Sequence, residues 1–377
     1  MNHMDPKTLD TVLALFDDSP ARVATAKARQ AAIWHNRPAD YLPFCFNVEV
    51  PEAKQFPEFD MVAEFNEPDV MLCKWLWGMI GTARSGSDSI PSVRPNLGTA
   101  FVATMFGLEQ TILPHTLPWL KQHLTKEQIE RFAVPDDVSG LGLMPKAIEL
   151  FRFYRQKLGG RGFTFLADTQ SPFDLAHLVR GNDVFTDIYD DPPFLHHLLG
   201  LTTKMYIAAS KLMKQVSGEP PNAGAHGGLW MDGGGVRACE DSSTLLPPAA
   251  VDEFVIPCTQ KALEAFGGGW VHYCGNNQRL LDALIDDAPA VRGINFGNPE
   301  RHDRTTLLPR LLAKGKFYFG GWPRLPDETD RAYLTRILRP LAGERRGLVL
   351  QGGVDTSTPE KAKAAMELWH GLQDEGR

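Results

Sequence analysis

Long hydrophobic runs are missing from this sequence of 377 residues. No apolar stretch approaches the roughly 20 residues that a membrane-spanning helix needs. The opening residues, Met1 to Pro6, carry neither the basic cluster nor the apolar segment of a secretory signal. The sequence therefore predicts a cytoplasmic protein that is not embedded in a membrane.

An excess of basic residues is also missing. The chain has 39 Lys and Arg residues against 46 Asp and Glu residues, which gives a formal net charge of −7. Proteins whose main task is to bind nucleic acid need a concentrated basic surface for the phosphates. We therefore expect a small-molecule substrate and no nucleic-acid partner.

Cysteine is scarce, and its number is odd. The five cysteines are widely scattered: Cys45, Cys73, Cys239, Cys258 and Cys274. This pattern predicts free thiols in a reducing compartment and not a disulfide framework. Since Cys45, Cys73 and Cys258 have apolar neighbours, they are predicted to be core residues. Cys239 and Cys274 are the candidates for chemistry.

Predicted strands alternate with predicted helices along most of the chain, which indicates a parallel sheet. The predicted strands cover residues 44–50, 92–99, 162–170, 234–241, 270–275, 291–296, 316–320 and 348–352. The predicted helices cover residues 6–36 with a break at Asp18-Ser19-Pro20, then 146–158, 193–216, 249–266, 280–287, 305–313 and 359–372.

This number of strand–helix units predicts an eight-stranded (β/α)8 TIM barrel with an N-terminal helical extension. We assign residues 1–40 to the extension and residues 41–377 to a single barrel domain. A doubly wound open sheet is the alternative. The absence of a Gly-x-Gly-x-x-Gly turn between a strand and a helix disfavours its dinucleotide-binding form.

Polar residues follow nearly every predicted strand, at the end where β/α barrels carry their active sites. The candidate catalytic residues are Asp168, His226, Glu240 and Asp241. The candidate substrate-binding residues are Arg94, Asn96, Gln170, Asn276 and Asn295.

Simpler roles stay open for several of these residues. Asp168 could cap the helix that follows it, and Asp241 could cap a short helical turn. His226 lies in a glycine-rich loop, where the backbone can approach a ligand closely, but a loop histidine is often structural.

His272 and Cys274 lie on the same face of one predicted strand because they are two residues apart. If residues 234–241 form a neighbouring strand, Cys239 would join them. Two thiolates and one imidazole suit zinc with a fourth position open for substrate, and zinc would hold a substrate thiol as the thiolate. The metal-free alternative has these polar residues binding a carboxylated substrate, with Arg94 as the anion clamp.

Several segments together resemble a known family. Residues 272–276 read His-Tyr-Cys-Gly-Asn, and an apolar helical run at 280–284 and Gly-Ile-Asn-Phe at 293–296 follow. Residues 245–257 contain Leu-Leu-Pro-Pro and end in Phe-Val-Ile-Pro, and residues 348–355 read Leu-Val-Leu-Gln-Gly-Gly-Val-Asp. These segments resemble the uroporphyrinogen decarboxylase superfamily, and within it most closely the cobalamin-dependent methyltransferases, over about residues 160–360.

The resemblance implies a β/α barrel in which His272 and Cys274 bind zinc. The zinc would activate a thiol that accepts methyl from a corrinoid protein. The family's further cysteine ligand near the last strand is missing, since residues 352–355 read Gly-Gly-Val-Asp. Cys239, Glu240 or Asp241 would have to take its place. The arginine pair of the decarboxylase proper is missing near residues 39–43.

We therefore expect a zinc-dependent methyltransferase that moves methyl from a corrinoid carrier to a thiol or related acceptor. The expected partners are a small-molecule substrate, a corrinoid protein and a second copy of the chain in a homodimer. One alternative is a metal-free decarboxylase or lyase that acts on a carboxylated, porphyrinogen-like substrate. The other is a non-catalytic barrel that lost part of its site.

Overall fold

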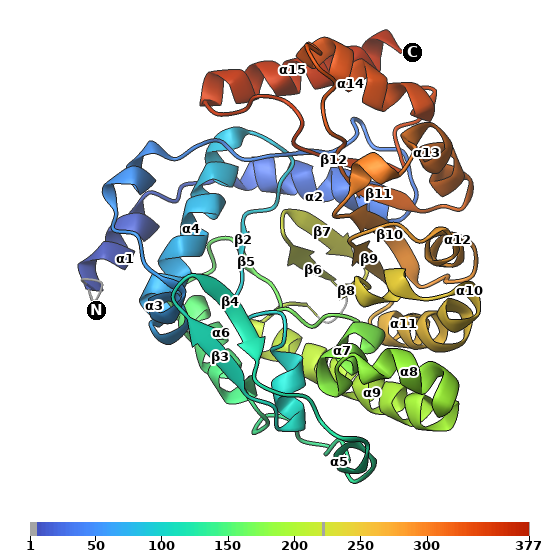
Figure 1. The fold of residues 1–377 in the computed structure, drawn as a ribbon. Coiled ribbons are helices and arrows are strands. Elements are labelled where there is room, and N and C mark those ends of the chain that lie inside the picture. The colour runs from blue at the N-terminus through green and yellow to red at the C-terminus, as the bar shows by residue number, and fades with distance from the viewer. Residues whose placement is uncertain (1–5, 221–222, 377) are drawn as a thin grey trace.

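A computed structural model describes residues 6–220 and 223–376. Eight strands surround a common axis and helices cover them on the outside (Figure 1). The strands are β1 (Phe44–Cys45), β2 (Ser92–Val93), β5 (Phe163–Thr164), β8 (Val236–Cys239), β9 (Gly269–Tyr273), β10 (Val291–Phe296), β11 (Phe317–Gly320) and β12 (Leu348–Gln351). The predicted (β/α)8 barrel is therefore confirmed.

The barrel wall is a continuous sheet over only part of its circumference. Six strands pair in parallel in the order β1-β12-β11-β10-β9-β8, and β2 pairs in parallel with β5 alone. Within residues 6–220 and 223–376, no ladder joins β1 to β2 or β5 to β8. The wall therefore has two seams, which helices and loops complete.

Within the described part of the chain, two helices precede the first strand, and the others lie between or after the strands. The first third contains α1 (Pro6–Ala14), α2 (Pro20–Trp34), α3 (Met61–Asn66) and α4 (Pro68–Ser85). The middle contains α5 (Lys126–Glu130), α6 (Met144–Leu158), α7 (Pro172–Arg180), α8 (Asp183–Asp190) and α9 (Pro192–Ser217). The last part contains α10 (Pro248–Ala250), a π-helical turn (Val251–Val255), α11 (Ile256–Glu264), α12 (Gln278–Asp286), α13 (Arg304–Ala313), α14 (Asp330–Leu338) and α15 (Pro359–Glu375).

Helix α2 begins as the sequence predicts. The side chain of Ser19 accepts a hydrogen bond from the backbone N–H of Arg22, and Pro20 occupies the first helical position. Both features stabilise a helix start, because the first N–H groups of a helix have no partner within it.

Helix α2 and an antiparallel hairpin close the N-terminal end of the barrel. The hairpin consists of β6 (Ala223–His226) and β7 (Leu229–Asp232). Gln30 of α2 donates to the carbonyl of Gly228 at 3.1 Å and accepts from the N–H of Trp230 at 2.5 Å. The ring of Trp34 packs on Phe317 at the start of β11, with centroids 5.8 Å apart. The domain boundary at residue 40 stays a prediction.

Strand β1 is much shorter than the predicted strand over residues 44–50. After Cys45 the chain leaves the sheet, and the N–H of Val48 bonds to the carbonyl of Gly81 in α4. A Cβ atom at Gly81 would lie 2.5 Å from the Val48 oxygen, so only glycine permits this approach. The hydrophobic pattern of this segment reflects contact with a helix and not sheet pairing.

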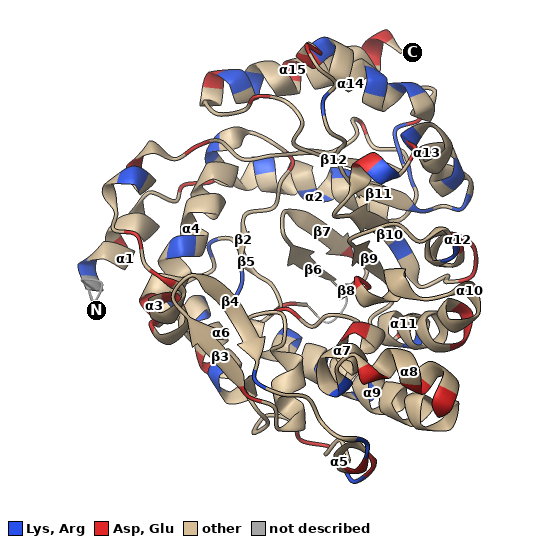
Figure 2. Cartoon of the chain, in the orientation of Figure 1, with Lys and Arg blue, Asp and Glu red and all other residues tan. Residues whose placement is uncertain are grey.

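A second hairpin, formed by β3 (Gln110–Leu113) and β4 (Thr116–Leu120), was not predicted, and neither were α7, α8 and α14. The hairpin lies in the connection that follows β2, on the side of the barrel where the strands end (Figure 1). Basic and acidic residues are interspersed along the outer helices (Figure 2). Among the residues that the structure describes, no helix is long and apolar enough to cross a bilayer.

Candidate functional site

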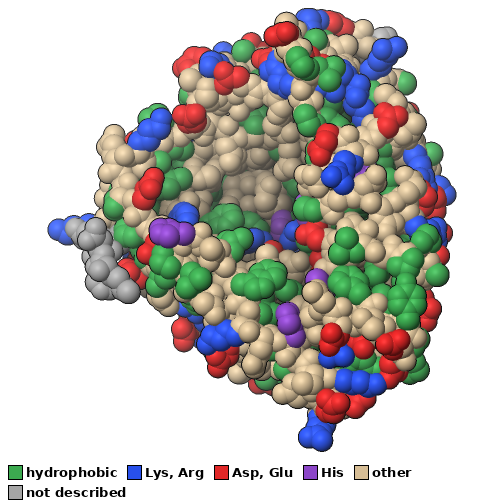
Figure 3. Space-filling view, viewed as in Figure 1, with side chains coloured by type: hydrophobic (Ala, Val, Ile, Leu, Met, Phe, Trp, Pro, Cys, Tyr) green, Lys and Arg blue, Asp and Glu red, His purple; other side chains and the backbone are tan. Residues whose placement is uncertain are grey.

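The face in Figure 3 is hollowed at its centre, where Figure 1 places the strands. Acidic, basic and histidine side chains gather along the lower right edge of this hollow, and most of the remaining wall is uncharged (Figure 3). The strands on the charged side of the hollow are β5, β8, β9 and β10.

Three polar side chains form a row across neighbouring strands. Cys239 of β8 is in register with His272 of β9, which is in register with Asn295 of β10. Since alternate residues of a strand face the same way, the register places these side chains together at the ends of the strands. Two predicted metal ligands and one predicted substrate-binding residue therefore lie side by side.

The imidazole of His272 is held in one orientation. Its Nδ1 is hydrogen-bonded to Oδ1 of Asn295, and the Nδ2 of Asn295 donates to the carbonyl of Phe319. The second bond fixes which end of the amide faces the imidazole, so Nδ1 carries the proton. Nε2 then has a free lone pair, as in histidines whose other ring nitrogen is fixed by a hydrogen bond while they bind a metal.

Sulfur, nitrogen and oxygen donors converge beside this lone pair. One ligand atom each from Cys239, Asp241 and His272 lies within 4.8 Å of the other two. Sγ of Cys239 donates to Oδ2 of Asp241 at 3.3 Å, and Nε2 of His272 lies 3.9 Å from Oδ1 of Asp241. The thiol of Cys274, which is exposed, lies 3.5 Å from the same Nε2. Thiolate, imidazole and carboxylate are the ligands that zinc takes in proteins, so the residues fit this metal.

The loop that carries Asp241 is held by a carboxylate that the sequence reading missed. Asp174, in the first turn of α7, accepts the backbone N–H of Asp241 through Oδ2 and that of Ser242 through Oδ1, each at 2.8 Å. Oδ1 of Asp241 in turn accepts the N–H of Cys274 at 2.5 Å. Asp174 therefore positions the loop of one candidate ligand, and Asp241 positions the backbone of another.

Room for the Cys274 thiol comes from a glycine. A Cβ atom at Gly297, after β10, would lie 2.3 Å from Sγ of Cys274. The neighbouring Asn298 accepts the N–H of Gly275 at 2.9 Å, which ties the two loops together. Any larger residue at position 297 would displace the thiol.

Without a metal, the environment favours the uncharged forms of the two thiols and of the imidazole. Burial raises the pKa of the Cys239 thiol well above its usual value, and burial followed by the charge of Asp241 raises the pKa of Cys274. Burial, assisted by the cation of Arg237, lowers the pKa of His272. A neutral imidazole is ready to bind a metal, whereas the thiols need a nearby cation to ionise.

A charged cluster lies deeper in the hollow. Asp168 stands between two arginines: its Oδ1 lies 3.4 Å from the guanidinium of Arg237, and its Oδ2 lies 3.7 Å from that of Arg94. Gln170 donates to Asp168 at 2.7 Å from a left-handed backbone conformation, φ 60°, which is uncommon outside glycine. The helix cap that Asp168 could have supplied comes from Ser171. The cluster carries a net positive charge and suits an anion.

Arg237 was missed in the sequence reading, although a signal for it existed. It precedes Cys239 by two residues in β8, so alternation alone places both side chains on one face. The charged residue in an otherwise apolar strand was therefore a candidate.

His226 ends β6 and lies among rings. Its imidazole is 4.8 Å from the ring of Phe165 and 5.2 Å from that of Trp270, measured between centroids. Burial, followed by the charges of Arg237 and Arg94, lowers its pKa well below the usual value. The structure therefore gives His226, in the hairpin that closes the barrel, the surroundings of a neutral group.

Three other predicted site residues are not among the side chains that converge at the candidate metal site. Glu240 is 0% exposed on the opposite face of β8 from Cys239, and it accepts hydrogen bonds from Ser243 and Thr259. Asn96 donates to Glu64 at 2.8 Å near α3. Asn276 is exposed on the loop after β9.

The last strand supplies no ligand in place of the missing cysteine. A Cβ atom at Gly353 would lie 2.1 Å from the hydroxyl of Tyr333, so the position requires glycine. Asp355 accepts from Ser357 and pairs with Lys361 at 2.6 Å on the surface. Cys239 and Asp241 of β8 and its loop stand at the site instead.

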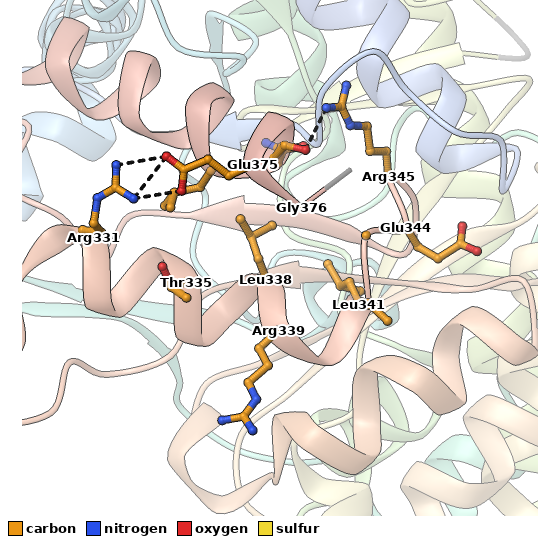
Figure 4. A pocket seen from close by; sticks show the side chains of 13 residues that line it. Arg331, Thr335, Leu338, Arg339, Leu341, Glu344, Arg345, Glu375 and Gly376 are labelled. Atoms are coloured by element: carbon orange, nitrogen blue, oxygen red, sulfur yellow. Dashed lines mark hydrogen bonds and ion pairs between the residues drawn. The ribbon is translucent and has the colours of Figure 1, made fainter.

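A separate pocket of about 540 Å³ lies between α14 and α15 (Figure 4). Residues 339–345 of its wall lead into the beginning of β12, so the pocket lies toward the end of the barrel opposite the candidate site. Two of its charged side chains, Arg331 and Glu375, pair with each other at 2.9 Å. None of the predicted site residues lines it.

Comparisons with known proteins bear on the fold and the family. The chain resembles a solved methyltransferase from Methanosarcina mazei with a TM-score of 0.65 and 16% sequence identity, over 93% of this chain and 98% of that one. At this identity the likeness shows the fold alone. No curated protein matches the chain. The sequence model for uroporphyrinogen decarboxylase (URO-D) matches residues 93–364. The chain therefore belongs to the uroporphyrinogen decarboxylase family.

Proposed function

We propose that this member of the family is a zinc-dependent methyltransferase that moves a methyl group from a corrinoid carrier protein to a thiol acceptor. The observation that carries the proposal is the convergence of Cys239, Asp241 and His272, with the lone pair of His272 fixed by Asn295. The fold shared with a methyltransferase is consistent with it.

Zinc held by Cys239, Asp241 and His272 would supply the ability to keep a thiol ionised near neutral pH. Cys274 is close enough to act as a fourth ligand or to leave that position to the acceptor. Asn295 keeps Nε2 of His272 unprotonated, and Asp174 keeps the Asp241 loop in place.

The transfer balances without an oxidant or reductant. The thiol proton of the acceptor leaves to solvent, and its sulfur forms a bond to the methyl carbon. The bond between the methyl group and the carrier breaks, and its electron pair stays on the carrier. The arginine–aspartate cluster deeper in the hollow would orient an acceptor that carries an anionic group.

The rim of the hollow supports a protein as the methyl donor. Large apolar side chains are exposed together on the hairpin that follows β2: Leu113 is 51% exposed, Leu117 is 58% exposed and Trp119 is 56% exposed. Apolar side chains around the opening of a site are typical of a surface that a partner covers. A corrinoid carrier would bring its methyl group to the ligands from this side.

A second candidate is a metal-free carboxy-lyase, favoured by the two arginines beside Asp168. In this case Arg94 and Arg237 would bind the substrate carboxylate, and the thiols would take no part.

Metal content separates the two candidates. We expect the protein purified without chelator to contain close to one zinc per chain, measured by elemental analysis. His272→Ala and Cys239→Ala should lose the zinc and the transfer of methyl from a methylated corrinoid protein to a thiol. Cys258→Ser is the matched control, because Cys258 is a half-buried thiol on α11 outside the site.

A zinc content near zero in the wild type, with activity unchanged in His272→Ala, would overturn the methyltransferase proposal. Release of carbon dioxide from a carboxylated substrate by the metal-free protein would then favour the lyase.

A further inference from the structure

A pocket opens at the seam between β1 and β2. Its volume is about 280 Å³, and α4 forms the wall where the strand ladder is missing. Uncharged residues line most of it: Asn47, Gly78, Thr82, Ser89, Ser92 and Gln351. It reaches the same end of the strands as the metal ligands, because Asn47 after β1 and Gln351 at the end of β12 line it.

Polar groups in this pocket are available to a ligand. The side-chain amide of Gln351 makes no hydrogen bond within the part of the chain that the structure describes, and it is partly exposed. Asn47 uses its Oδ1 to accept from Thr82 at 2.7 Å, which leaves its amide N–H groups. Both amides can therefore pair with neutral donors or acceptors of a bound molecule.

One wall of the pocket is aromatic and borders the charged cluster. Trp75 and Phe165 both line the pocket and contact each other edge to face, with centroids 6.1 Å apart. The guanidinium carbon of Arg94 lies 5.6 Å from the Trp75 ring and 5.7 Å from the Phe165 ring. Arg94 thus stands between the pocket and Asp168.

Arg94 still has unused capacity to bind an anion. Its Nε is buried and has no hydrogen-bond partner. Asp168 lies 3.7 Å from the guanidinium and is shared with Arg237, so one carboxylate faces two cations. A second carboxylate, from a ligand, would balance the charge and give Nε a partner.

We propose that the pocket at the β1–β2 seam binds the planar ring of a small acid, whose carboxylate pairs with Arg94 and Arg237. The inference rests on the proposed function and deepens it, because this acid would be a reactant at that site. The ring packs against Trp75 and Phe165, and the amides of Asn47 and Gln351 bind its neutral polar substituents.

The volume limits the size of the acid. An apolar cavity of about 150 Å³ accepts benzene, so a pocket of about 280 Å³ holds one substituted ring. A tetrapyrrole, with four such rings, would not fit within this pocket. The pocket therefore suits a single ring.

Equilibrium binding of benzoate tests the proposal directly. Benzoate, acetate and benzyl alcohol are titrated into the wild type by calorimetry or NMR, with the metal content of the same preparation measured. We expect benzoate to bind more tightly than acetate, which lacks the ring, and more tightly than benzyl alcohol, which lacks the charge.

Gly78→Leu fills the pocket without disturbing the helix. Gly78 lies inside α4, and a Cβ atom there would meet no atom within 4 Å. This variant should lower the affinity for benzoate by at least about tenfold and leave the affinity for acetate unchanged. Arg94→Gln should lower the affinity for both acids and leave the affinity for benzyl alcohol unchanged.

Gly371→Leu is the matched control, because Gly371 lies inside α15 with equally open surroundings and far from the pocket lining. Equal benzoate affinity in the wild type and Gly78→Leu would overturn the proposal, and so would benzoate that binds no better than acetate.

The metal measurement keeps the two ideas apart. Zinc present with no ring-dependent binding would reject the ring pocket and leave the methyltransferase standing. Ring-dependent binding in a protein that holds no zinc would support the pocket and reject the metal site.

Discussion

The two parts of the barrel wall differ in how they are built and in what they carry. On one side, β8, β9 and β10 belong to an unbroken parallel ladder, and the row Cys239, His272, Asn295 lies across it in register. On the other side, β2 and β5 form an isolated pair, and a pocket with a largely uncharged lining occupies the seam beside β1.

The difference reflects two demands on one site. Metal ligands must be held within fractions of an ångström, and neighbouring strands in register achieve this because their backbones are hydrogen-bonded to each other. A ligand pocket needs space, and the missing ladder between β1 and β2 provides it, with Gly78 of α4 in the lining. The predictions below test whether the two sides can be disturbed independently.

The largest expected effect is a loss of zinc affinity, and it should distinguish the two adjacent carboxylates Asp241 and Glu240. Asp241→Asn should reduce zinc affinity by more than the roughly 100-fold that residues orienting a ligand contribute, because Asp241 lies within 4.8 Å of the other donors. Glu240→Gln should retain zinc, because Glu240 is buried on the opposite face of β8. Competition with a chromogenic chelator measures both. Equal losses would mean that the two faces of β8 are not distinct.

A pair of glycines tests the two sides against each other. Gly297→Ala should displace Cys274, because the new Cβ atom would lie 2.3 Å from Sγ, and we expect about 10–100-fold weaker zinc binding. Gly78→Ala on the seam side meets no atom and should leave zinc binding unchanged. It should also raise the free energy of unfolding by about 0.5–1 kcal/mol, since alanine favours a helix over glycine. If Gly297→Ala binds zinc normally, Cys274 is not part of the metal site.

A third substitution removes the group that orients the imidazole of His272 and keeps all of the metal ligands. Asn295→Ala frees Nδ1 of His272, so the imidazole can rotate or change tautomer. Zinc affinity should fall by about 10-fold, toward the lower end of the range for such partners. Asn66→Ala is the control, because Asn66 is exposed and donates to the carbonyl of Val62 in α3, away from the metal ligands. An unchanged affinity in Asn295→Ala would show that the strand register alone orients the ligand.

Much of the ladder side could be predicted from sequence. The alternation that defines a strand already places His272 and Cys274 together, and the order of the strands adds Cys239. The same alternation shows that Glu240 faces away from Cys239, and that Arg237 faces with it.

Other parts of the site depend on contacts between distant segments. Asp174 reaches residue 241 only because α7 docks against the end of β8. The seam pocket exists because residues 46–50 leave the sheet to pack on α4, although their hydrophobic pattern is the same as that of a strand. Local pattern therefore predicts elements and faces, while the seams follow from packing between elements.

A last comparison concerns stability and not metal binding, at a buried cation at the start of the ladder side. Lys316 precedes β11, is 7% exposed, and donates to the carbonyls of Leu284 and Ala288 at the end of α12. Burial lowers its pKa from 10.5 to about 8. Between these two values the unfolded chain binds more protons than the native protein, so the contribution of Lys316 to the free energy of unfolding rises as the pH increases, by at most roughly 3 kcal/mol.

Lys316→Met should remove this rise. The free energy of unfolding of wild type minus that of Lys316→Met should therefore increase between pH 8 and pH 10.5, as measured by chemical denaturation. Subtraction cancels the other groups that titrate in this range. Lys363→Met is the control, because Lys363 is exposed on α15, away from Lys316. Parallel curves for the wild type and Lys316→Met would show that water reaches this end of the ladder, and that the sheet side is less rigid than its register suggests.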